Sequence, residues 1–296
     1  MDSSRELRTL LERWGRRLQG RSPQTARSYR HVVAGFIDSL GGKRLSTAAA
    51  ERWVEGLRGL APATQAHRIS AVKTFLRYGQ DQGLVSKGPI DVLVRPRVTV
   101  TSYGRYLTAE ELGVLFGAAR DLSPRHFGTV AALTLTGCRV SELAGARWGD
   151  LYLDPAGRLG LRIVGKGGKE RAVKVRRDLF ETLAALHGSA ELDADDPTPL
   201  IPGQRSRNGA PACSTRTLQR LVGDAVATAV AAGLKKRRAS AHYLRHSHAT
   251  LAAAAGADAF VIQASLGHSR LETSQRYVHL ARGLAETTVD ALPPLG

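Results

Sequence analysis

The sequence predicts a mainly α-helical protein with a small β element in its second half. Apolar residues recur at helical spacing through residues 6–93 and again from Thr215 onward. Between these stretches, every second residue is apolar in 159–163 and in 173–175, on either side of a Gly-Lys-Gly-Gly run at 165–168. A change of period from about 3.6 to about 2 around a glycine-rich turn is typical of a β-hairpin. A chain of 296 residues is long enough for two modest domains, each with its own core.

The first domain is expected over residues 1–94 as a group of four helices. The four apolar blocks cover residues 7–18, 25–40, 48–57 and 64–82. Pro23 and Pro62 precede the second and fourth blocks. We therefore expect Thr25 and Thr64, just after them, to open those helices.

Residues 95–105 predict a linker between the two domains. This segment has no helical period and contains arginine, proline and glycine. The second domain is then expected over residues 106–296. Thr108 and Glu111 have the spacing of a capping box, so a helix is expected to begin between them.

The rest of the second domain is predicted to place helices before and after the hairpin. Two helices are expected before it, at about 125–135 and at 140–148. Residues 189–212 are rich in Asp, Pro, Gly and Ser, which predicts a surface loop. The helical pattern from Thr215 then continues to the end of the chain.

The chain carries a formal net charge of +17, from 43 basic and 26 acidic residues. Residues 1–100 hold 18 basic and 8 acidic side chains and residues 101–296 hold 25 and 18, so both halves are positive. An excess of this size indicates a polyanionic partner such as nucleic acid. A generic basic protein from an arginine-rich proteome would have the same charge, so charge alone names no function.

The two cysteines, Cys138 and Cys213, are far apart and form neither a metal-ligand spacing nor a disulfide framework. Such usage suits a reducing cytoplasm. No apolar run approaches the roughly 20 residues that span a bilayer. We therefore expect a cytoplasmic protein with no membrane partner, no metal and no organic cofactor.

Arg139 is the first residue whose surroundings indicate chemistry. It follows Thr136-Gly137-Cys138 at the expected start of a helix, and Glu142 lies one turn further on the same face. Glu142 is interpreted as a buttress for Arg139. A helix entry with a surface ion pair would show the same pattern, so this segment alone leaves both interpretations open.

A second group lies in the run Ser-Ala-His-Tyr-Leu-Arg-His-Ser-His at 240–248. His242 and Arg245 are three residues apart and share a helical face. Two side chains that can donate hydrogen bonds to a phosphate therefore face the same direction. His242 and His246 also have the spacing of helical zinc ligands. No glutamate follows His242 and no third ligand motif is present, which argues against a metal site.

A third group combines Leu-Gly-His-Ser at 266–269 with Tyr277, nine residues after His268. A tyrosine near a helix end is usually a half-buried core residue, so this pair alone indicates no function. Its meaning depends on the other two groups.

Together these segments resemble the tyrosine recombinase (phage integrase) family, and more closely its Xer-like members, along nearly the whole chain. The strings that carry the resemblance are Thr-Gly-Cys-Arg-Val-Ser-Glu-Leu at 136–143, Gly-Lys-Gly-Gly-Lys-Glu-Arg at 165–171, His-Tyr-Leu-Arg-His at 242–246, Leu-Gly-His-Ser at 266–269, and Tyr277. Five strings in the family's order make a chance match implausible.

The resemblance implies that residues 1–94 form a helical core-binding domain of the SAM-like type and that 106–296 form a mixed α+β catalytic domain. In the first domain it rests on Thr-Ala-Arg-Ser-Tyr-Arg at 25–30 and Arg-Ile-Ser-Ala-Val-Lys-Thr-Phe at 68–75. The residues expected to contact DNA are Arg27, Arg30, Arg68, Lys73 and Lys169.

The resemblance further implies one catalytic site around a scissile phosphate, formed by Arg139, Lys166, His242, Arg245, His268 and Tyr277. Guanidinium groups would bind the non-bridging oxygens while the tyrosine attacks phosphorus. His242 is the expected proton acceptor, and Lys166, in its hairpin turn, is the expected acid that protonates the leaving 5′ oxygen. Lys169 lies in the same turn and is the alternative acid. The product is a 3′-phosphotyrosine, from which a 5′ hydroxyl can reseal the DNA without ATP.

Double-stranded DNA is the implied partner, bound by a homo- or hetero-tetramer across two sites. A sister recombinase and a DNA-translocating motor protein are further partners that the resemblance implies. Near the terminus, Leu280, Leu284, Val289 and Leu292 form a short apolar stripe. The stripe suits either docking on a neighbouring protomer or packing on its own domain.

The expected role is Xer-like resolution of chromosome or plasmid dimers. The alternatives are an integrase of a phage or mobile element, a type IB-like topoisomerase with the same chemistry, and a DNA-binding protein without catalysis. A topoisomerase would reseal the same strand as a monomer, whereas a recombinase needs two sites. An inactive protein should lack part of the catalytic set, and every expected position is filled.

Overall fold

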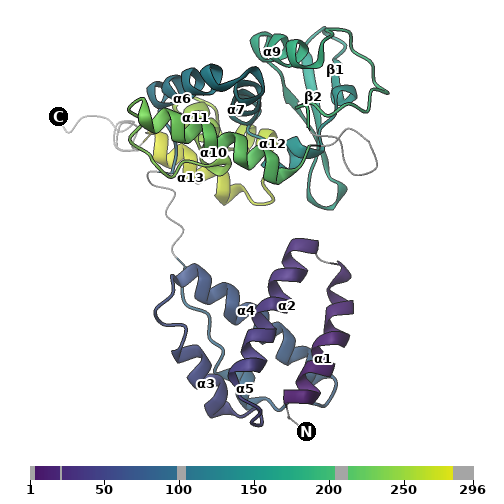
Figure 1. Cartoon of the computed structure of the whole chain (residues 1–296), viewed down its shortest axis with the longest axis vertical. Coiled ribbons are helices and arrows are strands. Elements are labelled where there is room, and N and C mark those ends of the chain that lie inside the picture. The colour runs from purple at the N-terminus through teal and green to yellow at the C-terminus, as the bar shows by residue number, and fades with distance from the viewer. Residues whose placement is uncertain (1–3, 21, 99–104, 204–212, 283–296) are drawn as a thin grey trace, which may run out of the picture. The chain divides into compact units, whose positions relative to one another are not determined.

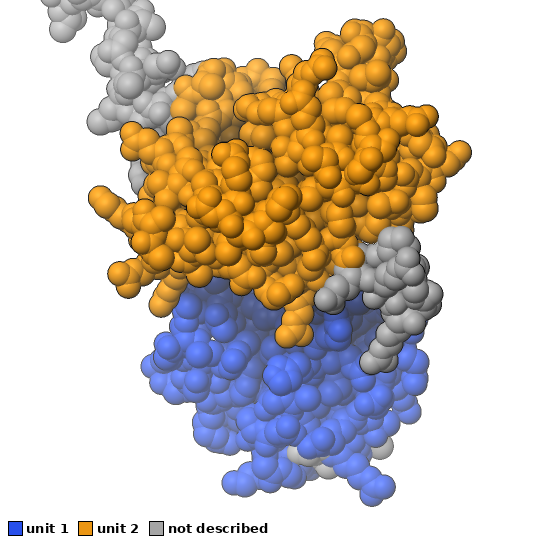
Figure 2. Space-filling model, turned by 45° about the horizontal axis from the view of Figure 1, so that its top comes forward, with its two compact units in different colours: residues 1–101 blue, residues 102–296 orange. Residues whose placement is uncertain are grey.

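The computed structural model describes residues 4–20, 22–98, 105–203 and 213–282. The chain divides into two compact units, Met1–Thr101 and Ser102–Gly296, so the boundary falls inside the predicted linker. The two units are blue and orange in Figure 2. Each unit contains its own cluster of buried apolar side chains.

The described part of the first unit is helical. Its elements are α1 (Ser4–Arg17), a 3-10 turn (Leu18–Gly20), α2 (Pro23–Ser39), α3 (Thr47–Glu55), α4 (Pro62–Asp81) and the short α5 (Gly88–Asp91) (Figure 1). The four predicted helices are confirmed, and α5 is an addition to them. Both α2 and α4 begin two residues earlier than predicted, at Pro23 and Pro62, because proline at the first helical position has no amide hydrogen to leave unpaired.

The core of the first unit lies among α1, α2 and α4. Trp14, Phe36 and Phe75 are buried there, and the Trp14 and Phe75 rings meet edge to face with centroids 5.4 Å apart. These large side chains produce the helical period of the sequence, since each helix turns one apolar face inward. Exposed positions on α2 and α4 carry Arg27 and Arg68.

The described part of the second unit combines eight α-helices with one three-stranded antiparallel sheet. The helices are α6 (Ala109–Leu122), α7 (Pro124–Thr136), α8 (Val140–Gly145), α9 (Arg177–His187), α10 (Thr215–Ala231), α11 (Ala241–Ala254), α12 (Ala259–Leu266) and α13 (Leu271–Arg282). The strands are β1 (Leu151–Leu153), β2 (Leu159–Val164) and β3 (Glu170–Lys174), in the order β1-β2-β3. In Figure 1 the sheet lies at one side of the helices, where β2 contacts α8 and β3 contacts α12.

The strands β2 and β3 form the predicted hairpin. Leu161 pairs with Val173, so the alternating apolar residues of both strands face the same core. The connection contains a 3-10 turn, Lys166–Gly168, and Gly167 adopts φ +77°, which lies in the left-handed region that favours glycine. The Gly-Lys-Gly-Gly run therefore sets Lys166 in a tight turn.

The helix predicted over 140–148 is shorter than expected, because α8 ends at Gly145. Trp148 is buried, and its amide donates to the Thr198 carbonyl at 2.8 Å. This bond ties the chain to the loop at 189–203 and replaces a further helical turn. The capping box at the start of α6 is confirmed, since each partner's side chain accepts a hydrogen bond from the other's amide.

Some predicted features fall outside the described residues, namely part of the linker (99–104), the last part of the surface loop (204–212) and the stripe residues Leu284, Val289 and Leu292. Within the described ranges, no helix is long and apolar enough to cross a membrane.

Candidate functional site

Arg139 lies at the N-terminus of α8, directly after a turn made by Gly137 and Cys138. Helix α7 ends at Thr136 and is capped by Gly137, whose φ of +62° lies in the left-handed region. The turn is also closely packed, because a Cβ on Gly137 would lie 2.5 Å from Leu266 Cδ2 and 2.8 Å from His248 Cδ2. The Thr-Gly-Cys-Arg sequence thus holds Arg139 at a defined place between two helices.

The carboxylate of Glu142 holds Arg139 in position, as predicted. It accepts hydrogen bonds from the Arg139 amide at 2.7 Å and from Arg139 Nη1 at 2.8 Å. Arg171, on β3, donates to the same two oxygens at 3.1 and 2.8 Å. Although burial opposes ionisation, the hydrogen bonds from Arg171 and Arg139 lower the pKa of Glu142 to about 2. This buried carboxylate is therefore charged at neutral pH.

The guanidinium of Arg245, on α11, is buried between two turns of the backbone. Its Nη1 donates to the Gly137 carbonyl at 2.6 Å and its Nη2 to the Leu266 carbonyl at 2.7 Å. Burial, together with the charge of Arg139, lowers the pKa of Arg245 to about 10, so it stays charged at neutral pH. The turns that precede Arg139 and His268 therefore fix the direction of this cation.

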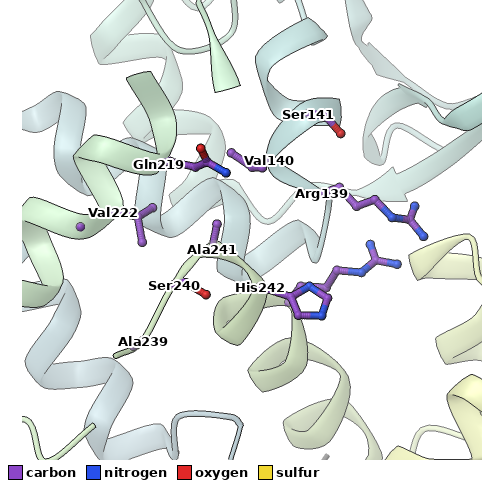
Figure 3. Close-up of a pocket in the computed structure, with 11 residues that line it drawn as sticks. Arg139, Val140, Ser141, Gln219, Val222, Ala239, Ser240, Ala241 and His242 are labelled. Carbon is purple, nitrogen blue, oxygen red and sulfur yellow. The ribbon is translucent and has the colours of Figure 1, made fainter. Parts of the chain in front are cut away.

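Arg139, His242 and Arg245 line one pocket of about 550 Å³ in the second unit (Figure 3). In Figure 3 the guanidinium of Arg139 and the ring of His242 lie together at one end, and Gln219 and Val222 of α10 lie at the other. Burial, followed by the charge of Arg245, lowers the pKa of His242, so its ring is neutral at neutral pH. The structure thus brings three of the expected site residues together from α8 and α11.

His268 follows Gly267, which ends α12 in the left-handed conformation with φ +65°. Its Nδ1 lies 2.8 Å from Ser274 Oγ, and its ring stacks on that of Tyr277 with centroids 6.1 Å apart. Burial, followed by the charge of Arg245, lowers the pKa of His268 to about 4. His268 therefore lies beside the phenol as a neutral ring.

Tyr277 lies on α13 with only 4% of its surface exposed, and it is not among the residues that line the pocket. Its Oη lies 2.7 Å from Nδ1 of His246 on α11. Burial raises the pKa of the phenol, while the charges of Arg245 and Arg276 oppose that effect. His246 is absent from the set expected from the sequence. Its position directly after Arg245 in the His-Tyr-Leu-Arg-His string is the signal that could have identified it.

Arg171 is a second side chain that is absent from the set expected from the sequence. Besides pairing with Glu142, it donates from Nε to the Ser265 carbonyl at 2.9 Å. The end of the hairpin is thereby tied both to α8 and to the segment before His268. Its place at the end of the Gly-Lys-Gly-Gly-Lys-Glu-Arg string is the signal for it. Lys166 opens the turn of this same hairpin, and Lys169 is exposed where the turn ends.

The residues of the first unit that are expected to contact DNA differ in their surroundings. Arg27, Arg30 and Arg68 are exposed. Lys73 is partly buried, and its ammonium donates to the Leu93 carbonyl at 3.0 Å. An ammonium bound to a carbonyl is less available to a phosphate, so the three arginines are better placed than Lys73.

His242 and His246 are the two residues that the metal alternative would use. Among the described residues, no group of three or more His, Cys, Asp or Glu side chains is arranged to hold a metal ion. The His242 and His246 rings meet edge to face with centroids 4.3 Å apart, and Nδ1 of His246 is paired with Tyr277.

Comparison with known proteins agrees with the motif strings. Residues 105–283 match the phage integrase family. Tyrosine recombinase XerC of Rhodospirillum centenum is 32% identical, and the match covers 96% of this chain and 92% of that protein. Tyrosine recombinase XerC of a Mycobacterium species is 34% identical, with 88% of this chain and 90% of that protein covered.

Solved structures share the fold. XerA recombinase is 26% identical with a TM-score of 0.51, over 97% of this chain and 99% of that one. XerH recombinase bound to a palindromic difH substrate, in a post-cleavage complex, is 23% identical with a TM-score of 0.73. The match covers 95% of this chain and 83% of that one. A lambda integrase dimer bound to a COC′ core site is 18% identical with a TM-score of 0.72, over 98% and 99%. The last two likenesses concern the fold alone.

Proposed function

Because this chain belongs to the phage integrase family, we propose that it is a site-specific tyrosine recombinase of the Xer type, which cuts and rejoins DNA strands through a 3′-phosphotyrosine. Relatives named tyrosine recombinases match nearly its whole length at 32 and 34% identity, so the likeness extends over both units. This favours the Xer type over a mobile-element integrase or a topoisomerase. Resolution of chromosome or plasmid dimers is the role that follows.

One geometric observation carries the proposal. Arg139, His242 and Arg245 line a single pocket, and Oη of Tyr277 lies 2.7 Å from Nδ1 of His246, the residue next to Arg245 on α11. A phosphodiester needs cations at its non-bridging oxygens and a nucleophile on the side opposite its leaving group. The second unit supplies both from helices that pack on one another, since α11 contacts α13.

In this proposal Arg139 and Arg245 bind the non-bridging oxygens, where negative charge gathers as the bond forms. Planar guanidinium groups suit this task because they offer paired donors that lysine does not. Glu142 and the two backbone carbonyls hold the cations before DNA arrives, so little reorganisation is needed during the reaction. His242 and His268 complete the phosphate-binding set as neutral donors.

Tyr277 is the nucleophile and Lys166 the general acid. The Oη–P bond forms as the P–O5′ bond breaks, and the lysine delivers a proton to the leaving 5′ oxygen. The phenol must lose its proton on attack, and a histidine of α11 accepts it; His242 is the one expected from the sequence. In the second half of the reaction a 5′ hydroxyl attacks the phosphotyrosine and the same steps run in reverse.

Double-stranded DNA is the proposed substrate. Arg27, Arg30 and Arg68 in the first unit and Lys169 in the second would contact phosphates, with Lys73 adding charge at longer range. Lambda integrase has been solved as a dimer on a core site and as a tetramer on a Holliday junction. We extend the proposal to a tetramer across two duplexes, with a sister recombinase and a DNA-translocating motor as its further partners.

The test uses a nicked suicide duplex that carries a site selected by the full chain from a random-sequence pool. Loss of the short strand next to the nick should trap the wild-type protein as a covalent adduct on a denaturing gel. Tyr277→Phe should bind the duplex normally and form no adduct, because it lacks the attacking oxygen. Tyr152→Phe removes the hydroxyl of a partly exposed tyrosine on β1 and serves as the control. An adduct with Tyr277→Phe would show that another residue is the nucleophile.

A further inference from the structure

Among the described contacts, the hydroxyl of Tyr277 has one hydrogen-bond partner. Its Oη lies 2.7 Å from Nδ1 of His246, and the ring centroids are 5.5 Å apart. The two residues are 31 positions apart, on helices α11 and α13 that pack against each other. The proposed phosphate-binding set makes no use of His246, although it is the side chain that touches the attacking oxygen.

We infer that His246, rather than His242, accepts the proton of Tyr277 as its oxygen attacks the phosphate. The inference rests on the proposed function. In the step, the O–H bond of Tyr277 breaks and an N–H bond forms at Nδ1 of His246. At the same time the Oη–P bond forms and the P–O5′ bond breaks, and Lys166 gives its proton to the leaving oxygen.

The three histidines of the candidate site, His242, His246 and His268, occupy distinct positions. His242 lines the pocket with both arginines, so it is placed for the phosphate. Nδ1 of His268 is paired with Ser274 Oγ at 2.8 Å, and its ring stacks on the phenol ring instead of meeting the hydroxyl. Only His246 presents a ring nitrogen to Oη at hydrogen-bond distance within the described structure.

For the phenol to donate in this hydrogen bond, Nδ1 of His246 must be unprotonated, with the ring proton on Nε2. Burial, followed by the charges of His242, Arg245 and Arg105, lowers the pKa of His246 to about 4, so the ring is neutral and able to accept at neutral pH. A bound phosphate would place negative charge beside Arg245 and offset its effect on His246. The base would therefore become stronger when substrate enters, and the phenol would stay protonated in the absence of DNA.

The first test needs no DNA. Long-range hydrogen–nitrogen correlation spectra of the full chain, with nitrogen-15 in its histidines, report which ring nitrogen carries the proton. The His246 signals are assigned from their absence in His246→Asn. We expect the proton on Nε2 and a bare Nδ1 whose shift changes in Tyr277→Phe. A proton on Nδ1 would overturn the inference. So would an Nδ1 chemical shift that is the same in the wild type and in Tyr277→Phe.

The second test measures the rate of adduct formation on the nicked duplex described above. His246→Leu should react about a hundredfold more slowly or worse, since a general base contributes at least that much. His246→Asn keeps a hydrogen-bond acceptor but takes up no proton at neutral pH, so it should fold like the wild type and remain slow. A wild-type rate for His246→Asn would reduce the role to positioning and overturn the proton transfer. His279→Leu, at an exposed histidine on α13, is the matched control and should react normally.

A duplex with sulfur in place of the leaving 5′ oxygen separates base from acid. Sulfur leaves without needing a proton. This substrate should therefore restore the rate of adduct formation in Lys166→Ala, whereas His246→Leu should remain slow. Rescue of His246→Leu would place that residue on the leaving-group side and overturn the inference. If His246→Leu reacted faster than the wild type, the hydrogen bond would be one that restrains the nucleophile. That result would also overturn the inference.

The two proposals fail in different ways. No adduct with the wild-type protein on either duplex would contradict the recombinase function itself. A normal wild-type adduct, with His246→Leu reacting at the same rate, would leave the function standing and remove only the role of His246.

Discussion

The guanidinium of Arg171 and the carboxylate of Glu142 form a buried pair that joins β3 to α8. Two hydrogen bonds of 3.1 and 2.8 Å connect them, and Arg171 also donates to the Ser265 carbonyl at 2.9 Å. Because Glu142 holds Arg139 as well, one carboxylate connects the hairpin, the first arginine of the site and the segment before His268. This connection affects the stability of the fold and the way that stability depends on pH.

Glu142→Ala should lower the free energy of unfolding by about 3–5 kcal/mol, because it leaves the cation of Arg171 buried without its counter-ion. Only 11% of the Arg171 side chain is exposed, so water cannot replace the carboxylate. Urea denaturation measures the change. Glu181→Ala is the control, since Glu181 and its partner Arg177 are 65% and 89% exposed and the loss there should stay below about 1 kcal/mol. Equal losses in the two variants would contradict the assignment.

Stability should also fall in acid in a way that depends on Glu142. Its folded pKa of about 2 lies below its ordinary value of 4.5, so the folded state binds this proton less readily than the unfolded state does. The contribution of Glu142 is complete above pH 4.5 and disappears as the pH falls toward about 2; it is on the order of 3 kcal/mol. Urea midpoints between pH 6 and pH 2.5 should thus fall less for Glu142→Gln than for the wild type. Parallel curves would show that other groups control acid stability.

Gly137→Ala should destabilise the second unit by about 2 kcal/mol or more. Its φ is +62°, and the added methyl group would meet Leu266 and His248 at less than 3 Å. Because the Gly137 carbonyl orients Arg245, slower adduct formation should accompany the loss. Gly113→Ala, at an exposed position inside α6 with open space around it, should instead leave stability equal or raise it by about 0.5–1 kcal/mol.

Arg139→Ala and Arg245→Ala should both slow adduct formation by about a hundredfold or more, if each supplies about 3 kcal/mol to the transition state. Their effects on folding should differ. Arg139 is 43% exposed, and its loss leaves Glu142 paired with Arg171. The free energy of unfolding of Arg139→Ala should therefore differ little from that of the wild type. Arg245→Ala leaves two carbonyls without donors and should cost about 2 kcal/mol or more. Unchanged rates in both variants would mean that the phosphate binds elsewhere.

The elements that could be predicted are those whose evidence is local. Helix period located α1 to α4, and alternation on either side of Gly-Lys-Gly-Gly located the hairpin and the turn of Lys166. The Glu142 buttress was also accessible, because an i, i+3 pair on a helix needs no knowledge of the rest of the fold. The prediction for α8 ran too far because its end depends on a hydrogen bond between Trp148 and Thr198, 50 residues apart.

The same distinction between local and long-range evidence applies to the candidate site. Sequence by itself determined which residue types are present, in which order, and on which helical face His242 and Arg245 lie. Only the tertiary structure decided that Arg245 is oriented by the Gly137 carbonyl 108 residues away, and that His246 meets the phenol of Tyr277. The physical reason is that helical and strand periods repeat over a few residues. They specify which side of an element faces inward, but the packing of α11 on α7 and α13 selects which inward side chains come within hydrogen-bond distance.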